Sequence, residues 1–172
     1  MIAPIPASLA DLTLQPERPG DAVQVEALID RAFGPGRLTK VSERVREIAD
    51  FAPELSICAW AGDRLAGVAR QSRITVGGAP VVFLGPLAVE EDQRGSGLGA
   101  RLVTAACEAA RAAGETCVLL VGDAPFFSRL GFSTEPGRDV ILPGPVDPAR
   151  VLVRALAGSQ ALSGPVGRAV RA

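Results

Sequence analysis

Hydrophobic residues follow two different periods along this chain, and these periods predict its elements. A repeat of three to four positions, typical of one face of an amphipathic helix, appears after Asp21, after Ser42 and after the glycine-rich segment at 95–99. Apolar runs separated by tight glycine turns at 62–63 and 77–78 predict an antiparallel meander. The expected helices span residues 22–33, 42–49, 98–113 and 126–130, and the expected strands span residues 12–14, 55–61, 65–76, 81–89, 116–121, 140–142 and 151–156.

The order of these elements is β-α-α-β-β-β-α-β-α-β-β, which predicts an α/β (mixed α+β) fold with helices on both faces of one sheet. The fourth strand, the long helix after it and the fifth strand form a β-α-β crossover, so these two strands should be parallel neighbours. The chain has 172 residues, which is close to the ~150 residues expected of one domain. We expect a flexible arm over residues 1–10 and one domain over residues 11–172, with a weakly specified tail after Gly158.

The composition contains no histidine and no tyrosine, which excludes His-based nucleophile relays, imidazole bases, His-containing zinc sites and a phenol acid. Proton transfers must use carboxylates, thiols, backbone groups or water, or catalysis must depend on holding the reactants together. No metal is expected. Eighteen basic and nineteen acidic residues leave a net charge of −1, so bulk attraction to nucleic acid or to an anionic membrane is not expected.

The three cysteines, Cys58, Cys107 and Cys117, are odd in number and lack a Cys-x-x-Cys spacing. This usage indicates free, buried thiols in a reducing compartment. The start of the chain has no basic region before an apolar stretch, and the longest apolar run, residues 79–89, is shorter than the ~18 residues of a membrane-spanning helix. The sequence therefore predicts a soluble cytoplasmic protein.

The candidate chemistry lies in the glycine-rich loop between the fourth strand and the long helix. Glycines at a helix start let several backbone N–H groups converge, and the helix dipole adds positive charge there, so the loop suits a phosphate. A P-loop is excluded because Gly-Lys-Ser/Thr is absent. Gly95, Gly97 and Ala100 satisfy Gly-x-Gly-x-x-Ala, but in a dinucleotide-binding fold this motif follows the first strand, which leaves that class as the more distant alternative. The third pattern is Arg-x-x-Gly-x-Gly, at Arg94, Gly97 and Gly99.

With this motif the sequence resembles the GNAT superfamily of acyl-CoA-dependent N-acetyltransferases, in particular a bacterial branch of predicted acetyltransferases. The similarity extends over residues 84–89, 118–123, 126–132, 151–157 and 161–166, and covers most of the chain from about residue 12. It implies acetyl-CoA as co-substrate, with the fourth strand pairing with the pantetheine arm, loop amides holding the pyrophosphate, and the thioester entering where the two parallel strands splay apart. The residues that it implies in binding are Leu87, Ala88, Val89, Arg94, Gly95, Ser96, Gly97, Leu98, Gly99, Ala100 and Phe127.

The sequence departs from this family at the expected general acid. Many relatives carry a tyrosine four residues before the Gly-Phe pair at 131–132, and here that position is Phe127. The two carboxylates that follow the parallel strands, Asp123 and Glu90, are the candidate proton acceptors, and solvated strand-end acids are the alternative interpretation of both. Phe127 either packs against the pantetheine or fills the core.

The resemblance implies acetyl transfer to a primary amine of a small molecule or peptide by direct attack in a ternary complex, because no cysteine is placed as a covalent relay. The alternative is a catalytically weak CoA-binding or sensor module of the same fold, and a homodimer is compatible with the sequence. An anionic acceptor is a further hypothesis, with surface charge as its alternative. It depends on cations of the first helix–helix loop and of the meander, which are Arg37, Lys40, Arg44, Arg70 and Arg73.

Overall fold

The computed structural model describes residues 5–158 and 161–170. Its α-helices are α1 (Ala22–Phe33), α2 (Val41–Ile48), α3 (Leu98–Ala112) and α4 (Ala124–Ser128). Its strands are β1 (Thr13–Pro16), β2 (Asp50–Phe51), β3 (Ile57–Ala61), β4 (Arg64–Val76), β5 (Ala79–Val89), β6 (Cys117–Val121), β7 (Asp139–Ile141), β8 (Val151–Ala155) and β9 (Ser163–Arg168). The predicted α/β fold with one mixed sheet is confirmed, while β2 and β9 were not predicted.

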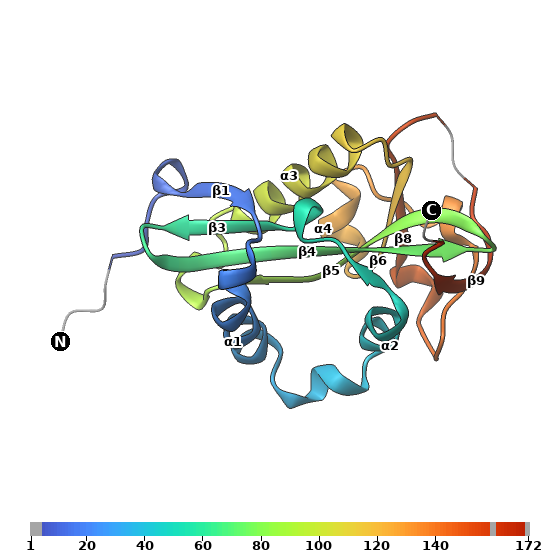
Figure 1. Cartoon of the computed structure of the whole chain (residues 1–172), viewed down its shortest axis with the longest axis horizontal. Helices are drawn as coiled ribbons and strands as arrows, with labels where there is room; N and C mark the ends of the chain where they lie inside the picture. Colours follow the sequence, from blue (N-terminus) through green and yellow to red (C-terminus); the bar gives the residue numbers. More distant parts are fainter. Residues whose placement is uncertain (1–4, 159–160, 171–172) are drawn as a thin grey trace.

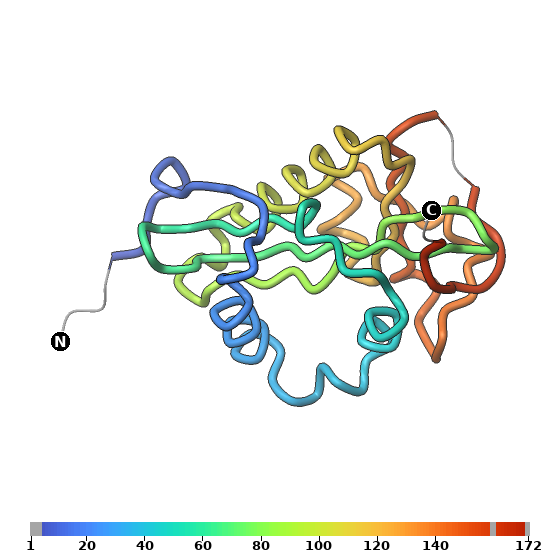
Figure 2. Tube along the Cα trace, viewed as in Figure 1, coloured from blue at the N-terminus to red at the C-terminus, as the bar shows by residue number. Residues whose placement is uncertain are grey.

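The sheet follows the path β1-β3-β4-β5-β6-β8, and β2 and β9 pair with β4 beside this path. The long antiparallel pair of β4 and β5 runs through the middle of the molecule, as the tube in Figure 2 shows. Helices α1 and α2 lie on one side of the sheet and α3 lies on the other (Figure 1). Each helix is held by its apolar face, since α1 buries Val25, Leu28 and Ile29 and α3 buries a longer stripe that begins at Leu98.

Strands β5 and β6 are parallel, as predicted, but they pair only at Val82–Val118 and Phe83–Leu119. Beyond this point β5 carries a bulge, because Leu84 and Leu87 of β5 pair with Gln71 and Ala69 of β4. Two residues of β5, Gly85 and Pro86, therefore stand opposite one residue of β4. A bulge bends its strand and increases the local twist, and proline has no N–H for a ladder, so the two parallel strands separate here.

The described part of the predicted N-terminal arm contacts the domain. The side-chain amide of Gln93 donates to the carbonyl of Ala7 at 3.0 Å, and the guanidinium of Arg101 donates to the carbonyl of Leu9. A 3₁₀ turn, Leu9–Asp11, then leads into β1. Residues 7–11 thus pack beside the loop that precedes α3, whereas residues 1–4 lie outside the described ranges. No helix within the described ranges is long and apolar enough to cross a membrane.

Candidate active site

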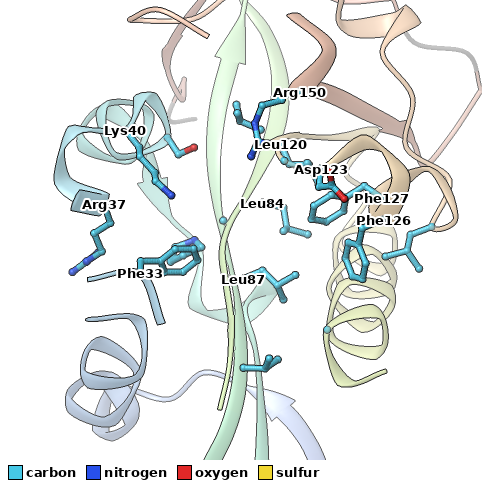
Figure 3. Close-up of a pocket in the computed structure, with 18 of the residues that line it drawn as sticks. Phe33, Arg37, Lys40, Leu84, Leu87, Leu120, Asp123, Phe126, Phe127 and Arg150 are labelled. Atoms are coloured by element: carbon cyan, nitrogen blue, oxygen red, sulfur yellow. The ribbon is translucent and has the colours of Figure 1, made fainter. Parts of the chain in front are cut away.

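A cavity of about 1230 Å³ opens where β5 and β6 separate. The segment from the end of α1 into α2 lines one side, and the N-terminus of α3 together with α4 lines the other (Figure 3). Leu84 and Leu87 of β5 and Leu120 of β6 lie between these two sides. Pockets for drug-sized ligands measure roughly 300–1,000 Å³. This cavity therefore has room for a long ligand and a second, smaller one.

After the bulge, the last three residues of β5 present alternate side chains to the cavity. Leu87 and Val89 line it, whereas Ala88 is buried on the opposite face among the residues that pack against α1. This alternation follows from the two-residue period of a strand. From residue 84 to residue 89, β5 pairs with β4 on one edge only, and no described strand covers the other edge. An extended ligand can therefore add to β5 as a further strand would.

The glycine-rich loop turns backbone N–H groups toward the same cavity. Gly95 and Gly97 have φ angles of 77° and 91°, a left-handed conformation that suits glycine. Gly97 is the N-cap residue of α3 and has no side chain with which to cap the helix. The hydroxyl of Ser96 accepts from the amide of Leu98 at 3.2 Å, and the next two amides, those of Gly99 and Ala100, have no intramolecular acceptor within the described ranges. The N-terminus of α3 is thus free to bind an anion.

The sequence-predicted loop residues divide into two groups. Arg94, Gly95, Gly97, Leu98, Gly99 and Ala100 line the cavity, and Ser96 does not. Ser96 instead donates to the carbonyl of Gln93 at 2.6 Å and so stabilises the turn before α3. Gln93 was not predicted, yet it is 2% exposed and lines the cavity, with its amide nitrogen bound to the N-terminal segment. The buried Gln93 side chain therefore joins the N-terminal segment to the loop.

Phe127 combines the two interpretations that the sequence left open, because it lines the cavity and also belongs to the core. It is 8% exposed and packs in the cluster that contains the buried face of α3. Its ring lies edge-on to those of Phe126 and Phe132, with centroid distances of 4.8 and 5.8 Å. Gly122 makes room for it, since a Cβ at Gly122 would lie 2.5 Å from a ring carbon of Phe127. Phe127 therefore occupies the expected position of the acid without a hydroxyl group.

Only one of the two candidate carboxylates reaches the cavity. Asp123 follows β6, is exposed and lines the cavity. Glu90 does not line it, because Val89 faces the cavity and the next residue of an extended chain points the opposite way. The Glu90 carboxylate accepts from the guanidinium of Arg31 on α1 at 2.5 Å. Asp123 is thus the carboxylate that the structure brings to the site.

The cations predicted for the acceptor side also divide. Arg70 and Arg73 lie outside the cavity, where Arg70 pairs with Glu17 and Glu26 and Arg73 pairs with Glu54 and Glu115, a correction to their expected role. Arg44 donates to the carbonyl of Pro143 at 3.2 Å and does not line the cavity either. Contacts that connect separate segments of the chain, ion pairs for Arg70 and Arg73 and a hydrogen bond for Arg44, explain these three side chains better than ligand binding does.

Lys40 and Arg37 do line the cavity, together with cations that the sequence did not single out. Arg37 pairs with Asp30 at 2.9 Å and with Glu26 at 3.3 Å. Arg46 lies beside Gly85 and pairs with Glu43; burial lowers the pKa of its guanidinium, while the Glu43 carboxylate opposes that shift. The other unpredicted charged residues of the cavity are Arg129, Asp147 and Arg150. No local motif marks them, because they reach the cavity through the pairing of distant segments.

The three cysteines are free and buried, as the sequence predicts, and none of them lines the cavity. Burial raises the pKa of the Cys58 thiol to about 12 and also raises the pKa values of Cys107 and Cys117. The nucleophilic form of cysteine is the thiolate. These thiols are therefore unsuited to carry an acyl group. The described residues contain no cluster of three or more His, Cys, Asp or Glu that would hold a metal ion.

The family assignment agrees with this geometry. A model of the acetyltransferase (GNAT) family matches residues 23–132. A relative named as the uncharacterized N-acetyltransferase YhbS of Escherichia coli K12 is 30% identical over 159 residues, which cover 91% of this chain and 93% of YhbS. The chain therefore belongs to the acetyltransferase (GNAT) family. The predicted class of enzyme, an N-acetyltransferase, is confirmed.

Two solved structures are similar throughout their length. The crystal structure of YhbS from Escherichia coli in complex with CoA has a TM-score of 0.76 and 26% identity, and the match covers 96% of this chain and 92% of that one. A GNAT family acetyltransferase from Brucella melitensis in complex with acetyl-CoA has a TM-score of 0.68 and 24% identity, covering 91% and 94%. The second likeness shows the fold alone.

Proposed function

We propose that this chain transfers an acetyl group from acetyl-CoA to a primary amine of a small molecule or peptide. The observation that carries this proposal is the separation of β5 from β6 beside the free Gly99 and Ala100 amides at the N-terminus of α3. The pyrophosphate binds the free amides of α3 with Arg94 beside them, and the pantetheine arm adds to the open edge of β5 at Leu87–Val89. The similar structure of YhbS, which is in complex with CoA, supports the binding of CoA by this chain.

The amine attacks the thioester directly in a ternary complex. Binding both reactants in one cavity turns a bimolecular step into an effectively intramolecular one, which lowers the barrier without any covalent intermediate. The buried, high-pKa cysteines outside the cavity support this route. Three free thiols also fit a reducing compartment, so a cytoplasmic location is part of the proposal, as is a homodimer.

Asp123 accepts, through water, the proton that the acceptor ammonium loses before the neutral amine attacks. An amine of pKa about 10.4 must lose a proton before it can attack, which costs about 4.6 kcal/mol at pH 7. Asp123 is the sequence-predicted carboxylate that lines the cavity, and it stands at the N-terminus of α4 on the side of β6. This position at the cavity supports Asp123 as the proton acceptor.

Thiol release from acetyl-CoA with a panel of primary amines tests this function. We expect amine-dependent release by the wild type, and for Asp123→Asn a kcat lower by about tenfold, because a positioned base typically contributes 10²–10⁴-fold and water replaces part of it. The Kd of acetyl-CoA should stay within about twofold. The control is Asp139→Asn, an exposed strand residue outside the cavity. Binding of acetyl-CoA without release by any amine would support the sensor module instead, and parallel double-reciprocal lines would contradict direct attack.

Phe127→Tyr tests the missing general acid. We expect kcat to rise by about tenfold or more, because a phenol at this position can protonate the departing thiolate, and a positioned acid contributes roughly 10²–10⁴-fold. A thiol of pKa about 8.5 leaves tolerably without that proton, so the wild type remains active but slow. Phe51→Tyr adds the same hydroxyl to an exposed ring outside the cavity and should leave kcat unchanged. An unchanged kcat in Phe127→Tyr would show that the proton comes from another group.

A further inference from the structure

The cavity is strongly basic, although the whole chain carries a net charge of −1. Asp123 and Asp147 are its acidic side chains among the described residues. The cationic side chains that line it are Arg37, Lys40, Arg46, Arg94, Arg129 and Arg150. An amine substrate enters as a cation, which such a cavity repels. The excess of positive side chains therefore indicates that the ligands of this cavity carry negative charge.

Acetyl-CoA accounts for part of this charge. Arg94 begins the glycine-rich motif, and Arg129 ends α4, so both belong to the side of the cavity formed by the α3 N-terminus and α4. Phosphate groups held by the α3 N-terminus lie within the reach of such side chains. Arg37 and Arg46 are already compensated by carboxylates of α1 and α2. Two cations, Lys40 and Arg150, remain.

Lys40 and Arg150 reach the cavity from opposite sides. Lys40 precedes α2, and its ammonium lies 5.3 Å from the centre of the Phe33 ring. Arg150 directly precedes β8, and its carbonyl accepts from the amide of Gly122 at 2.9 Å, which fixes its backbone beside the end of β6. In Figure 3, Lys40 lies on the wall that carries Phe33 and Arg150 lies near Leu120 across from it, while Leu87 lies farther toward the other end of the view. They flank the point where β5 and β6 separate.

Neither cation has a carboxylate within ion-pair distance in the described ranges, although the chain contains nineteen acidic residues. The Asp147 carboxylate accepts from the backbone of Ala149 at 3.0 Å, and within the described ranges Asp123 forms no ion pair with either cation. The Phe33 ring keeps the lysine ammonium at the cavity wall through a cation–π contact. Both cations are therefore available to an anion that enters with the substrate.

We propose that the acceptor amine carries a carboxylate or phosphate group, which Lys40 and Arg150 bind. This inference rests on the proposed function. The anionic group neutralises the basic end of the cavity, so a zwitterionic acceptor enters where a plain alkylammonium ion does not. Charge-assisted hydrogen bonds from the two cations then direct the amine toward the thioester and Asp123.

Matched pairs of amines test this inference. The pairs are O-phosphoethanolamine with ethanolamine, and β-alanine with β-alaninamide. With wild type and acetyl-CoA we expect kcat/KM at least about tenfold higher for the anionic member of each pair. Lys40→Ala and Arg150→Ala should each lower kcat/KM for the anionic member by about tenfold. The kcat/KM for the neutral member should change by less than about twofold, and the Kd of acetyl-CoA should stay unchanged. Arg138→Ala, which removes an exposed cation outside the cavity, is the matched control.

Calorimetry on the CoA-saturated protein gives a readout that does not depend on turnover. O-phosphoethanolamine should bind the wild type about tenfold more tightly than it binds Lys40→Ala or Arg150→Ala. Equal affinity, or equal kinetic effects on both members of a pair, would overturn the inference. Failure to bind CoA at all would overturn the proposed function and the inference with it. CoA binding with transfer to neutral amines alone would overturn only the inference.

Two further outcomes would assign the cations differently, and each would overturn the inference. A preference for succinyl-CoA over acetyl-CoA that disappears in Lys40→Ala and Arg150→Ala would place the anion on the acyl group. Lys40 is also the only lysine of the chain. Acetyl-Lys40, found by peptide mass spectrometry after incubation with acetyl-CoA alone, would make this residue an acceptor. We expect neither result.

Discussion

Replacing Gly99 with leucine should weaken acetyl-CoA binding by about 100-fold or more, or about 2.7 kcal/mol, while the fold persists. Gly99 is the second residue of α3, and a Cβ there would lie 3.6 Å from Phe126 and 3.9 Å from Leu87. Alanine therefore fits at ordinary contact distance, whereas the longer leucine extends between these two side chains. This gap is the place proposed for the pantetheine arm.

The helix itself should tolerate the leucine. Gly99 does not have a positive φ, and glycine inside a helix costs roughly 0.5–1 kcal/mol relative to better helix formers. The melting temperature of the free protein should thus stay level or rise, and calorimetric titration should show the loss of affinity. Thr104→Leu places the same side chain at an exposed position of α3 outside the cavity and should bind normally. Gly99→Leu with wild-type affinity would show that the ligand takes another path.

Arg70→Met should lower the free energy of unfolding by about 3 kcal/mol, because it leaves a buried carboxylate without its partner. The side chain of Glu17 is 3% exposed, and Arg70 binds it at both oxygens, with distances of 2.8 and 3.1 Å. Methionine keeps much of the side-chain volume of arginine but supplies no donor. For a chain of this size the loss corresponds to a fall in melting temperature of roughly 6–12 °C.

Urea denaturation measures this loss, and a second substitution separates the charge from the packing. Glu17→Gln combined with Arg70→Met should recover part of the stability, because the unpaired buried charge is then removed. Arg138→Met breaks an exposed pair with Glu135 and should cost less than about 0.5 kcal/mol. The Kd of acetyl-CoA should remain within about twofold in all three variants. An unchanged stability together with a changed acceptor KM would return Arg70 to the substrate site.

The elements around the cofactor could be predicted because their signals are local. The apolar period of α3, the long apolar strand before it and the glycines between them are continuous in the sequence. β9 could not be predicted, because Gly164, Pro165 and Gly167 interrupt any strand pattern and its pairing with β4 links positions about 90 residues apart. The start of β9 lies so close to Gly77 that a Cβ there would be 2.0 Å from the carbonyl oxygen of Ser163, a contact that no local pattern indicates.

Side-chain direction limited the prediction of the site. The sequence placed both Asp123 and Glu90 at strand ends, but the position of the pleat decides which side chain enters the cavity, and Glu90 points to Arg31 instead. The Gly-Pro pair at 85–86 was a usable signal, since a proline inside a strand is typical of a bulge. Arg150 had no such signal, because it reaches the cavity through the pairing of β8 with β6.

Calorimetric titration of the wild type with acetyl-CoA tests the central claim most directly. We expect one acetyl-CoA bound per chain, with a Kd between about 1 μM and 1 mM, the usual range for enzyme substrates. CoA should compete with acetyl-CoA and NAD should not. The glycine-rich loop before α3 follows β5 and opens beside the separated β5 and β6, whereas the loop of a dinucleotide-binding fold follows its first strand. No heat of binding at millimolar acetyl-CoA, or displacement of acetyl-CoA by NAD, would contradict the proposal that this cavity binds acetyl-CoA.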